Sequence, residues 1–258
     1  MTNAGRMSVL RSFRAVLERR RVAINMKIPK LARFLEEGRY LNVYELTAKK
    51  TGATGAELAA AVELQLTSFS NQRLAIDRLF SFGTDAHYAA LNLGGAGLTR
   101  YGDACVVFRP GAWSACSTCF AGDSIRLCFS AAGNLAASEA MVLGDFAPGE
   151  DAVALAVVAH AADLLEGTAI CVDPVKVRRH LETGDLAIEV HLHGAVTRDE
   201  IAEVIMEQKK LEELEAISRK YDLLLPPRPF AYDIVPEFRR TQALLEDHGI
   251  PLVGAETG

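Results

Sequence analysis

The sequence predicts an α+β protein with one main domain. Short apolar runs rich in β-branched and aromatic residues are interspersed with segments of helical period, and no internal repeat is visible. The 258 residues are 50% hydrophobic and 24% charged, an ordinary globular composition with enough apolar residues for a sizeable core. We expect a basic helical extension over residues 1–38, the main domain over 39–205, and a helical extension over 206–258 packed on that domain.

Charge is distributed unevenly along the chain. Residues 1–50 contain 12 lysines and arginines against 4 acidic residues, whereas the whole chain has a formal net charge of −5. A basic segment of this kind is typical of contacts with nucleic acid, an acidic partner or a membrane surface. A solvated basic helix packed on an acidic body explains the pattern equally well.

The cysteines and the lack of a long apolar run favour a cytoplasmic protein. No apolar stretch follows the N-terminal arginines as in a signal peptide, and none approaches the roughly 20 residues that span a bilayer. The five cysteines are odd in number, so we expect free thiols in a reducing compartment. Cys116 and Cys119 have redox or zinc spacing, but no second pair completes a four-ligand site, which favours buried strand thiols.

Helical patterns dominate the first 80 residues. The spacing of apolar residues predicts four helices, over residues 8–22, 30–37, 56–66 and 72–80. Gly38 should end the second helix as its C′ residue. Residues 39–47 are predicted to form a strand, because β-branched and aromatic side chains alternate there. Residues 49–55 and 82–97 are predicted loops, and the glycines of the second lack the Lys-Ser/Thr of a phosphate-binding loop.

The stretch from Tyr101 to Ser130 organises the middle of the chain. It contains an apolar strand, Ala104 to Phe108, a break at residues 109–111, and a second extended segment, Ala115 to Phe120. A third apolar run, Ile125 to Phe129, comes after them. Two strands joined by a Pro-Gly turn predict either an ordinary hairpin or a sheet that presents a few hydroxyl groups into a cleft.

The last third of the chain combines short strands with longer helices. Helices are predicted over residues 133–143, 152–165, 174–180, 198–221 and 236–248. Strands are predicted over residues 168–172 and 186–192. Thr197 and Glu200 have the spacing of a capping box, which places a helix start at residue 198. Residues 254–258 are expected to fray.

Glu189 is the first candidate for chemistry. A carboxylate within the apolar strand over residues 186–192 is costly to bury unless it is paired, hydrogen-bonded or functional. Strand alternation offers a simpler interpretation, in which Glu189 faces water while Ile188 and Val190 enter the core.

Two other kinds of site are weaker interpretations. His180, His191 and His193 suggest a metal site, since the last two share one strand face with Glu189, but no HExxH motif is present. A serine hydrolase is disfavoured because the sequence lacks a GxSxG nucleophile elbow.

Several motifs together resemble bacterial ADP-ribosyltransferase-like toxin and effector domains. They occur in this order: Gly38 to Asn42 (GRYLN), His87 to Asn92 (HYAALN), Tyr101 to Asp103 (YGD), Ser117 to Ser124 (STCFAGDS) and Ile188 to Val196 (IEVHLHGAV). The resemblance covers roughly residues 39–205.

The resemblance implies a split mixed or antiparallel β-sheet that binds NAD as co-substrate and transfers its ADP-ribose, with release of nicotinamide. Arg39, followed by Tyr40, takes the NAD-holding role, because a guanidinium can donate two hydrogen bonds to a pyrophosphate. Ser117 and Thr118 lie on the strand that supports the nicotinamide end. Glu189 is the implied catalytic glutamate, an anion beside the ribose where positive charge develops.

The sequence departs from the family pattern at two positions. Cys119 replaces the third residue of the Ser-Thr-Ser pattern, and Ala187 stands where arginine-modifying members have Gln or Glu. The acceptor therefore stays open between protein and nucleic acid, and Arg100 or a residue near Tyr44 is an alternative to Arg39. The family also implies a neutralising antitoxin partner. The first rival hypothesis is a non-catalytic binding protein on the same fold, and the second is a metal-dependent hydrolase.

Overall fold

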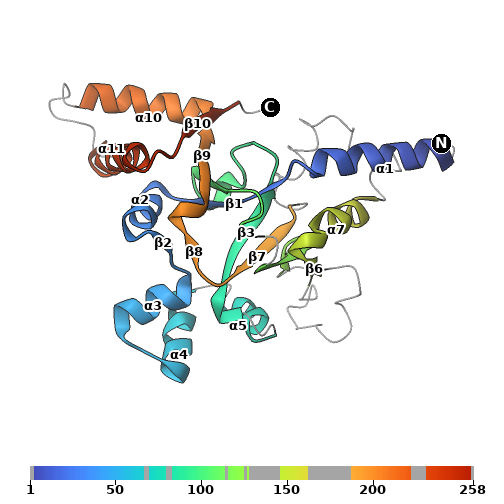
Figure 1. Ribbon diagram of the computed structural model, residues 1–258. Helices are drawn as coiled ribbons and strands as arrows, with labels where there is room; N and C mark the ends of the chain where they lie inside the picture. The colour runs from blue at the N-terminus through green and yellow to red at the C-terminus, as the bar shows by residue number, and fades with distance from the viewer. Residues whose placement is uncertain are drawn as a thin grey trace.

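The computed structural model describes residues 3–66, 70–79, 83–113, 116–124, 127, 146–161, 187–221 and 231–256. In these residues a mixed eight-stranded sheet is combined with eight α-helices and a separate two-stranded sheet, which confirms the predicted α+β class (Figure 1). The predicted ADP-ribosyltransferase type of sheet and the domain boundaries stay predictions.

The strands of the large sheet are β1 (Arg21–Met26), β3 (Ala86–Asn92), β4 (Ala104–Phe108), β5 (Ser117–Phe120), β6 (Phe146–Pro148), β7 (Glu189–His193), β9 (Ile201–Glu207) and β10 (Leu252–Ala255). The two strands of the small sheet are β2 (Arg39–Tyr40) and β8 (Val196–Thr197). The helices are α1 (Asn3–Leu17), α2 (Ile28–Glu37), α3 (Val43–Thr51), α4 (Gly55–Gln65), α5 (Ser70–Leu79), α7 (Ala152–Ala159), α10 (Gln208–Tyr221) and α11 (Ala231–Asp247).

The order of strands in the large sheet is β10-β9-β4-β1-β3-β7-β5-β6. The N-terminal strand β1 lies inside the sheet and pairs antiparallel with β3 on one side and β4 on the other. β7 connects the two parts of the sheet, because it pairs with β3 and with β5. Among the described strand pairs of this sheet only β9 and β10 are parallel.

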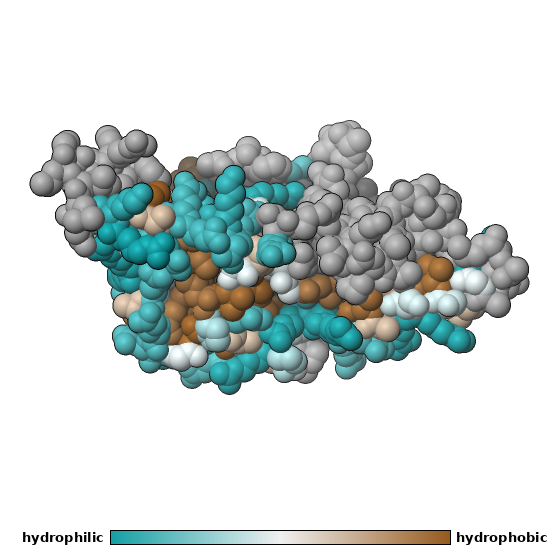
Figure 2. Space-filling model, turned by 90° about the horizontal axis from the view of Figure 1, so that it is seen from above, coloured by the Kyte–Doolittle hydropathy of each residue, from teal (hydrophilic) through white to brown (hydrophobic). Residues whose placement is uncertain are grey.

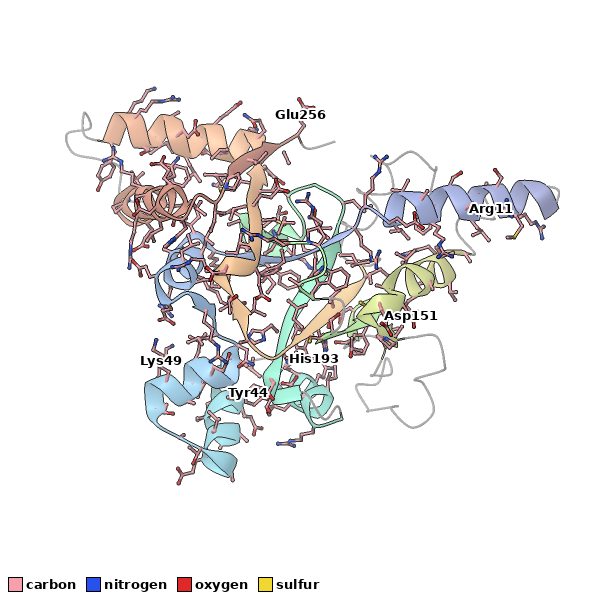
Figure 3. The ribbon with its side chains drawn as sticks, viewed as in Figure 1. Arg11, Tyr44, Lys49, Asp151, His193 and Glu256 are labelled. Atoms are coloured by element: carbon pink, nitrogen blue, oxygen red, sulfur yellow. The ribbon has the colours of Figure 1, made fainter. Side chains whose placement is uncertain are left out.

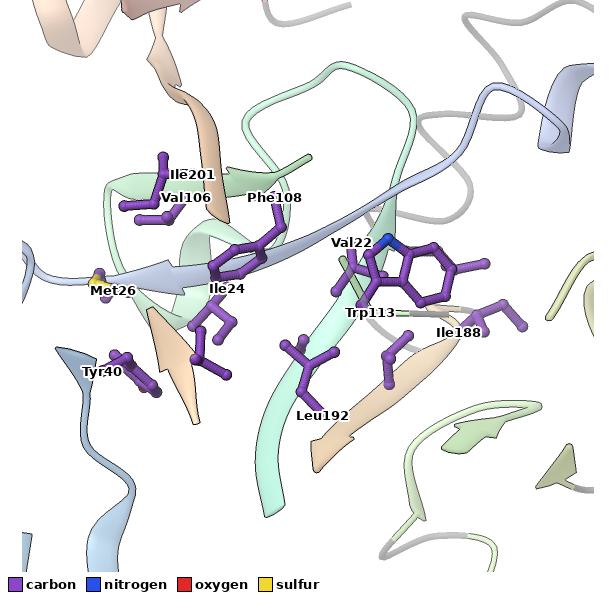
Figure 4. Packing of buried hydrophobic residues seen from close by; sticks show 14 of the residues in the cluster. Val22, Ile24, Met26, Tyr40, Val106, Phe108, Trp113, Ile188, Leu192 and Ile201 are labelled. Carbon is purple, nitrogen blue, oxygen red and sulfur yellow. The ribbon is translucent and has the colours of Figure 1, made fainter. Parts of the chain in front are cut away.

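One face of the large sheet carries the main hydrophobic core. Side chains from β1, β3, β4, β7 and β9 pack there against α1, α2, α7 and α11. Figure 4 shows the part of this core around Ile24, Phe108 and Leu192. Full burial of a Val, Leu, Ile, Phe or Met side chain contributes about 1.5–3 kcal/mol to the free energy of unfolding, relative to leaving it exposed. The core therefore holds the sheet, and β7 within it, from one side.

Two smaller clusters attach the outer helices. Ile28, Met206 and Phe238 belong to a cluster that joins α10 and α11 to α2 and β9. Tyr44, Val62 and Leu74 form the buried part of a second cluster, which joins α3, α4 and α5. This second cluster fixes α5 beside the end of β3, where the candidate site lies.

The sequence patterns of α2, α4 and α5 predicted these helices well. α2 has Pro29 in its first turn and ends at Gly38, whose φ of 70° is left-handed, as expected for a C′ glycine. The strand predicted over residues 39–47 is wrong beyond Tyr40. A capping box formed by Asn42 and Glu45 starts α3 at Val43 instead, and the loop predicted over residues 49–55 is shortened accordingly.

Two strands within the first hundred residues were missed. The helix predicted over residues 8–22 ends at Leu17, and β1 begins at Arg21, so the predicted helical extension also contains a strand. β3 lies in the predicted loop over residues 82–97. Both strands depend on pairing with distant segments, which local patterns do not report.

The stretch after Tyr101 contains the predicted strand β4, but β4 and β5 do not form a hairpin. β4 pairs with β1 and β9, whereas β5 pairs with β7 and β6. Gly102 permits the close approach of this stretch to β1, because a Cβ there would lie 2.1 Å from the backbone carbonyl carbon of Met26.

The C-terminal predictions need two corrections. The capping box of Thr197 and Glu200 is present, but it caps a single 3-10 turn. Residues 201–207 then form β9, so the helix predicted over 198–221 begins only at Gln208. Leu252–Ala255 forms β10 in the sheet, so residues 254 and 255 do not fray. The predicted elements over 125–129, 133–143, 168–172 and 174–180 lie wholly or mostly outside the described residues, as does the end of the helix over 152–165.

No described helix is both long and apolar enough to cross a membrane. On the surface seen in Figure 2, hydrophilic residues border a strip of apolar ones. Large apolar side chains with substantial exposure include Met7 on α1 and Val158 on α7.

Candidate active site on the polar face of β7

The strand β7 sends its side chains to two different faces of the sheet, because successive residues of a strand alternate. The apolar ones enter the main core together with the residue just before the strand: Ile188, Val190 and Leu192. The polar ones lie on the opposite face: Glu189, His191 and His193. The predicted alternation around Glu189 is confirmed.

Neighbouring strands bring further groups to the polar face of β7. Tyr88 on β3 and Thr118 on β5 both lie directly opposite His191. Phe120 follows Thr118 by two residues and therefore points to the same face. A carboxylate, two imidazoles, a threonine hydroxyl and two further aromatic rings are thus gathered on three adjacent strands.

The Glu189 carboxylate is held by three hydrogen bonds. The Ser124 hydroxyl donates to Oε1 over 2.6 Å, and the Ser124 backbone N–H donates to Oε2 over 3.3 Å. His191 Nε2 lies 2.5 Å from Oε1. An ionised carboxylate only accepts hydrogen bonds, so Nε2 carries the proton. The simpler interpretation of the strand placed Glu189 in water. Its side chain is only 18% exposed, so it does not face water freely.

These contacts keep Glu189 ionised. Burial alone would raise the pKa of its carboxyl, but the hydrogen bond and charge of His191 and the two hydrogen bonds from Ser124 outweigh burial and lower the pKa below its ordinary value. The site therefore contains a fixed negative charge at neutral pH.

The imidazole of His191 is packed between two aromatic rings. Its centroid lies 4.0 Å from that of Tyr88, at an interplanar angle of 35°, and 4.5 Å from that of Phe120, at 46°. His191 is only 1% exposed. The two rings restrict rotation of the imidazole, so its Nε2 stays directed at Glu189.

Tyr88 is in turn held by α5. Its hydroxyl donates to Asp77 Oδ1 over 3.2 Å, and the guanidinium carbon of Arg73 lies 3.2 Å from the centre of its ring. Asp77 also accepts hydrogen bonds from Arg73 Nε and, over 2.8 Å, from the hydroxyl of Tyr44 on α3. Figure 3 shows Tyr44 beside the helices drawn below the sheet, and His193 by the lower end of β7.

Thr118 and His193 form a second polar contact on this face. Thr118 Oγ1 lies 3.3 Å from His193 Nε2. Burial, and then the charge of His191, lower the pKa of His193. Of the four residues predicted to bind NAD, Thr118 is the one that the structure brings into the neighbourhood of Glu189.

Arg39 and Tyr40 lie on the small sheet and have other partners. The guanidinium of Arg39 forms an ion pair with Glu45, the capping-box residue of α3. Tyr40 is buried, and its hydroxyl accepts a hydrogen bond from Lys30 Nζ over 2.7 Å. Neither residue contacts Glu189, so the predicted NAD-holding residue Arg39 is not in direct contact with the predicted catalytic glutamate. Arg100, the alternative to Arg39, is exposed and bonded to the Tyr101 hydroxyl.

Ser117 points away from the polar face. It pairs with Leu192 across the strands and is 6% exposed. Its hydroxyl has no hydrogen-bond partner among the described residues. Ser117 therefore lies on the core side of β5, one residue out of phase with Thr118.

The other interpretations gain no support from the described residues. No group of three or more His, Cys, Asp or Glu in the described ranges could hold a metal ion, although His180 lies outside them. Cys119 is buried and Cys116 exposed, both as free thiols, and burial raises the pKa of Cys119 to about 12. Ser124 bonds to the carboxylate rather than to a histidine, which is not the order of a Ser-His-acid triad.

No family model matches the chain. No curated protein matches it either.

Sequence reasoning missed five residues of this site: Arg73, Asp77, Tyr88, Phe120 and Ser124. Ser124 belongs to the STCFAGDS motif and Tyr88 to HYAALN, but neither motif indicates by itself which of its residues meets Glu189. Arg73 and Asp77 have the i, i+4 spacing of an ion pair on a helix, which was a visible signal. The sequence did not reveal the pairing of β3 with β7, which brings Tyr88 to His191.

The arrangement is suited to stabilising positive charge. Glu189 is a fixed anion, and the rings of Tyr88 and Phe120 lower the local polarity, so the field of the carboxylate is less screened than in water. His191 and Ser124 both hydrogen-bond to the anion, and Ser124 does so without adding a charge to the site. A reaction in which a cation develops beside Glu189 is the kind that this site favours.

Proposed function

We propose that this chain is an NAD-dependent ADP-ribosyltransferase in which Glu189 is the catalytic residue. The observation that carries the proposal is the ionised Glu189 carboxylate, fixed by Ser124 and His191 on a sheet face lined by aromatic rings. The motif order around Arg39, Tyr101 and Ser117 supports the same reaction class.

In the proposed reaction, the bond between the ribose C1′ atom and the nicotinamide nitrogen breaks, and its electron pair leaves with nicotinamide. Positive charge then develops on the ribose, where the Glu189 carboxylate stabilises it. A nucleophile of the acceptor forms the new bond to C1′ and loses its proton. With water as nucleophile, the same site would hydrolyse NAD.

Thr118 is our candidate for contacting the nicotinamide end of NAD, because it lies on the same face as Glu189. Arg39 would hold the pyrophosphate only by exchanging Glu45 for it. Tyr40 and Ser117 are buried, and we propose that they support their strands rather than contact NAD.

The acceptor that we propose is a macromolecule, either a protein or a nucleic acid. Arg6 and Arg11 on α1 are exposed, which favours a polyanion. Figure 3 shows Arg11 on this helix. The proposals of a toxin or effector role, a cytoplasmic site of action and a neutralising antitoxin rest on the family resemblance alone.

The test is to incubate the purified protein with labelled NAD and whole-cell lysate, and then to separate protein from RNA and DNA. We expect Glu189→Gln to reduce transfer about 100- to 1,000-fold, the usual loss when one group that stabilises transition-state charge is removed. Glu203→Gln is the matched control, because Glu203 lies on the same sheet face and is also paired, to Arg21 at 2.6 Å. It should retain activity near that of the wild type.

The labelled fraction would name the acceptor class, and free ADP-ribose alone would indicate an NAD hydrolase. If the wild type neither turns over NAD nor binds it in calorimetry, the proposal is overturned. A non-catalytic binding protein then becomes the better account.

A further inference from the structure

A continuous series of contacts leads from α5 to the Glu189 carboxylate. It starts at the Arg73–Asp77 pair on α5, passes through Tyr88 on β3 and His191 on β7, and ends at Glu189. Three of these residues lie on elements that are distant in sequence from β7. Hydrophobic packing alone would not require the directed hydrogen bonds that this series contains.

Asp77 is the anchor of the series. It is 4% exposed and accepts hydrogen bonds from three side chains, those of Arg73, Tyr44 and Tyr88. A buried carboxylate is costly unless its oxygens are bonded, and here both oxygens are. Asp77 is therefore held in one position, and it holds the Tyr88 hydroxyl.

Tyr88 lies between a cation and an imidazole. Arg73 covers one part of its ring at 3.2 Å, and the imidazole of His191 stacks on the ring at 4.0 Å. Burial is the main reason that the pKa of the Tyr88 phenol is raised, with the nearby charges of Asp77 and Glu189 acting in the same direction. The phenol consequently stays protonated and continues to donate to Asp77.

His191 passes this constraint to the carboxylate. Tyr88 and Phe120 fix the plane of its ring, and the ring plane decides where the Nε2–H bond points. The charged or titratable groups described around Glu189 are His191 and His193 on β7 and, beyond Tyr88, Arg73 and Asp77 on α5. His191 is the member of this set with a direct contact to Glu189.

We propose that Asp77, Tyr88 and His191 are positioning residues that orient the Glu189 carboxylate, with α5 as the rigid support of the series. Its catalytic consequence rests on the proposed transferase function, whereas the physical coupling between α5 and Glu189 does not. Substitution of Asp77, Tyr88 or His191 should therefore change the titration of the Glu189 carboxyl even in the absence of NAD.

The experiment follows the titration of Glu189 by NMR in protein with ¹³C-labelled glutamate carboxyls, and assigns its signal from the spectrum of Glu189→Gln. His191→Phe keeps an aromatic ring in the stack but removes the donor, so we expect the pKa of Glu189 to rise. His191→Gln restores an N–H donor and should return part of the shift. A residue with only a packing role would show no such rescue.

Tyr88→Phe and Asp77→Asn test the remote part of the series. Tyr88→Phe removes only the hydroxyl group, which keeps the ring and the fold. We expect the Glu189 titration to move in the same direction as in His191→Phe, by less. If the wild type turns over NAD, kcat of the Tyr88→Phe and Asp77→Asn variants should be lower than that of the wild type by on the order of tenfold to a hundredfold. KM should change little, because the misplaced Glu189 carboxylate acts in the reaction step.

The two proposals fail in different ways. If the wild type does not turn over NAD, the transferase proposal fails, but the titrations still decide the coupling. If the wild type is active and Glu189 titrates identically in His191→Phe, Tyr88→Phe and Asp77→Asn, all shown to be folded by circular dichroism, the positioning inference is overturned.

Discussion

The two faces of β7 are built on opposite principles. The core face holds Val190 and Leu192 through shape and burial alone, whereas the polar face holds Glu189 and His191 through directed hydrogen bonds and ring stacking. The core face tolerates exchange among apolar side chains of similar volume, because dispersion contacts have no direction. The polar face depends on individual atoms, so a change that leaves the fold intact can remove its charge or its hydrogen bonds.

The largest effect on stability should come from the core face. Leu192→Ala removes a side chain that is 5% exposed in the main core, and we expect a loss of about 2–5 kcal/mol in the free energy of unfolding, measured by urea denaturation. Leu64→Ala is the matched control, since Leu64 is 85% exposed on α4 and should change stability by less than about 0.5 kcal/mol. Equal losses in the two variants would contradict the role given to this core.

The next largest effect on stability should come from the polar face and should appear at acidic pH. The pKa of Glu189 is lowered by folding, so its contribution is complete above its ordinary value of 4.5 and is lost as pH falls below that value. Glu189→Gln should therefore make the free energy of unfolding less dependent on pH below 4.5. Identical slopes for wild type and variant would show that the contacts of Ser124 and His191 do not hold the carboxylate ionised.

The smallest effect should come from a titratable group on the core side. Burial lowers the pKa of His87, and Glu45 and the carbonyl of Tyr40 offset part of this change. The unfolded chain then binds more protons than the folded one, so stability should decline as pH falls below the ordinary value of 6.5. His87→Gln should flatten this decline in urea denaturation between about pH 7 and pH 5.5. If the substitution leaves the pH dependence of the free energy of unfolding unchanged, His87 is not the group that causes the decline.

The sequence predicted local features well and distant pairings poorly. α2 followed from its apolar spacing and from Gly38, and the two-residue period around Glu189 correctly placed Val190 in the core. β3 was missed because AHYAALN contains no β-branched residue, and its strand state comes from pairing with β1 and β7.

Capping boxes show the limit of local signals in both directions. The box of Asn42 and Glu45 lies in a segment whose side-chain alternation predicted a strand, and it starts α3. The box of Thr197 and Glu200 was recognised, but Ile201 and its neighbours continue as β9 because β4 and β10 offer partners on both sides. A cap fixes where a turn begins, and tertiary pairing decides which element the chain forms next.

The candidate site was predicted only at its centre. Glu189 and the shared face of His191 could be read from one strand, but the contact of Ser124 with Glu189 spans 65 residues of sequence. The place of Arg39 was inferred from resemblance, and the structure gives it Glu45 as its partner.

The position of β7 between β3 and β5 has a consequence for the order of synthesis. β3 and β5 emerge from the ribosome long before β7, yet they belong to one sheet only through β7, which pairs with both of them. The residue that supplies the negative charge is thus carried on the segment that closes the gap. A nascent or truncated chain that stops before residue 189 has neither the joined sheet nor the carboxylate, so the site is complete only when β7 has paired with both strands.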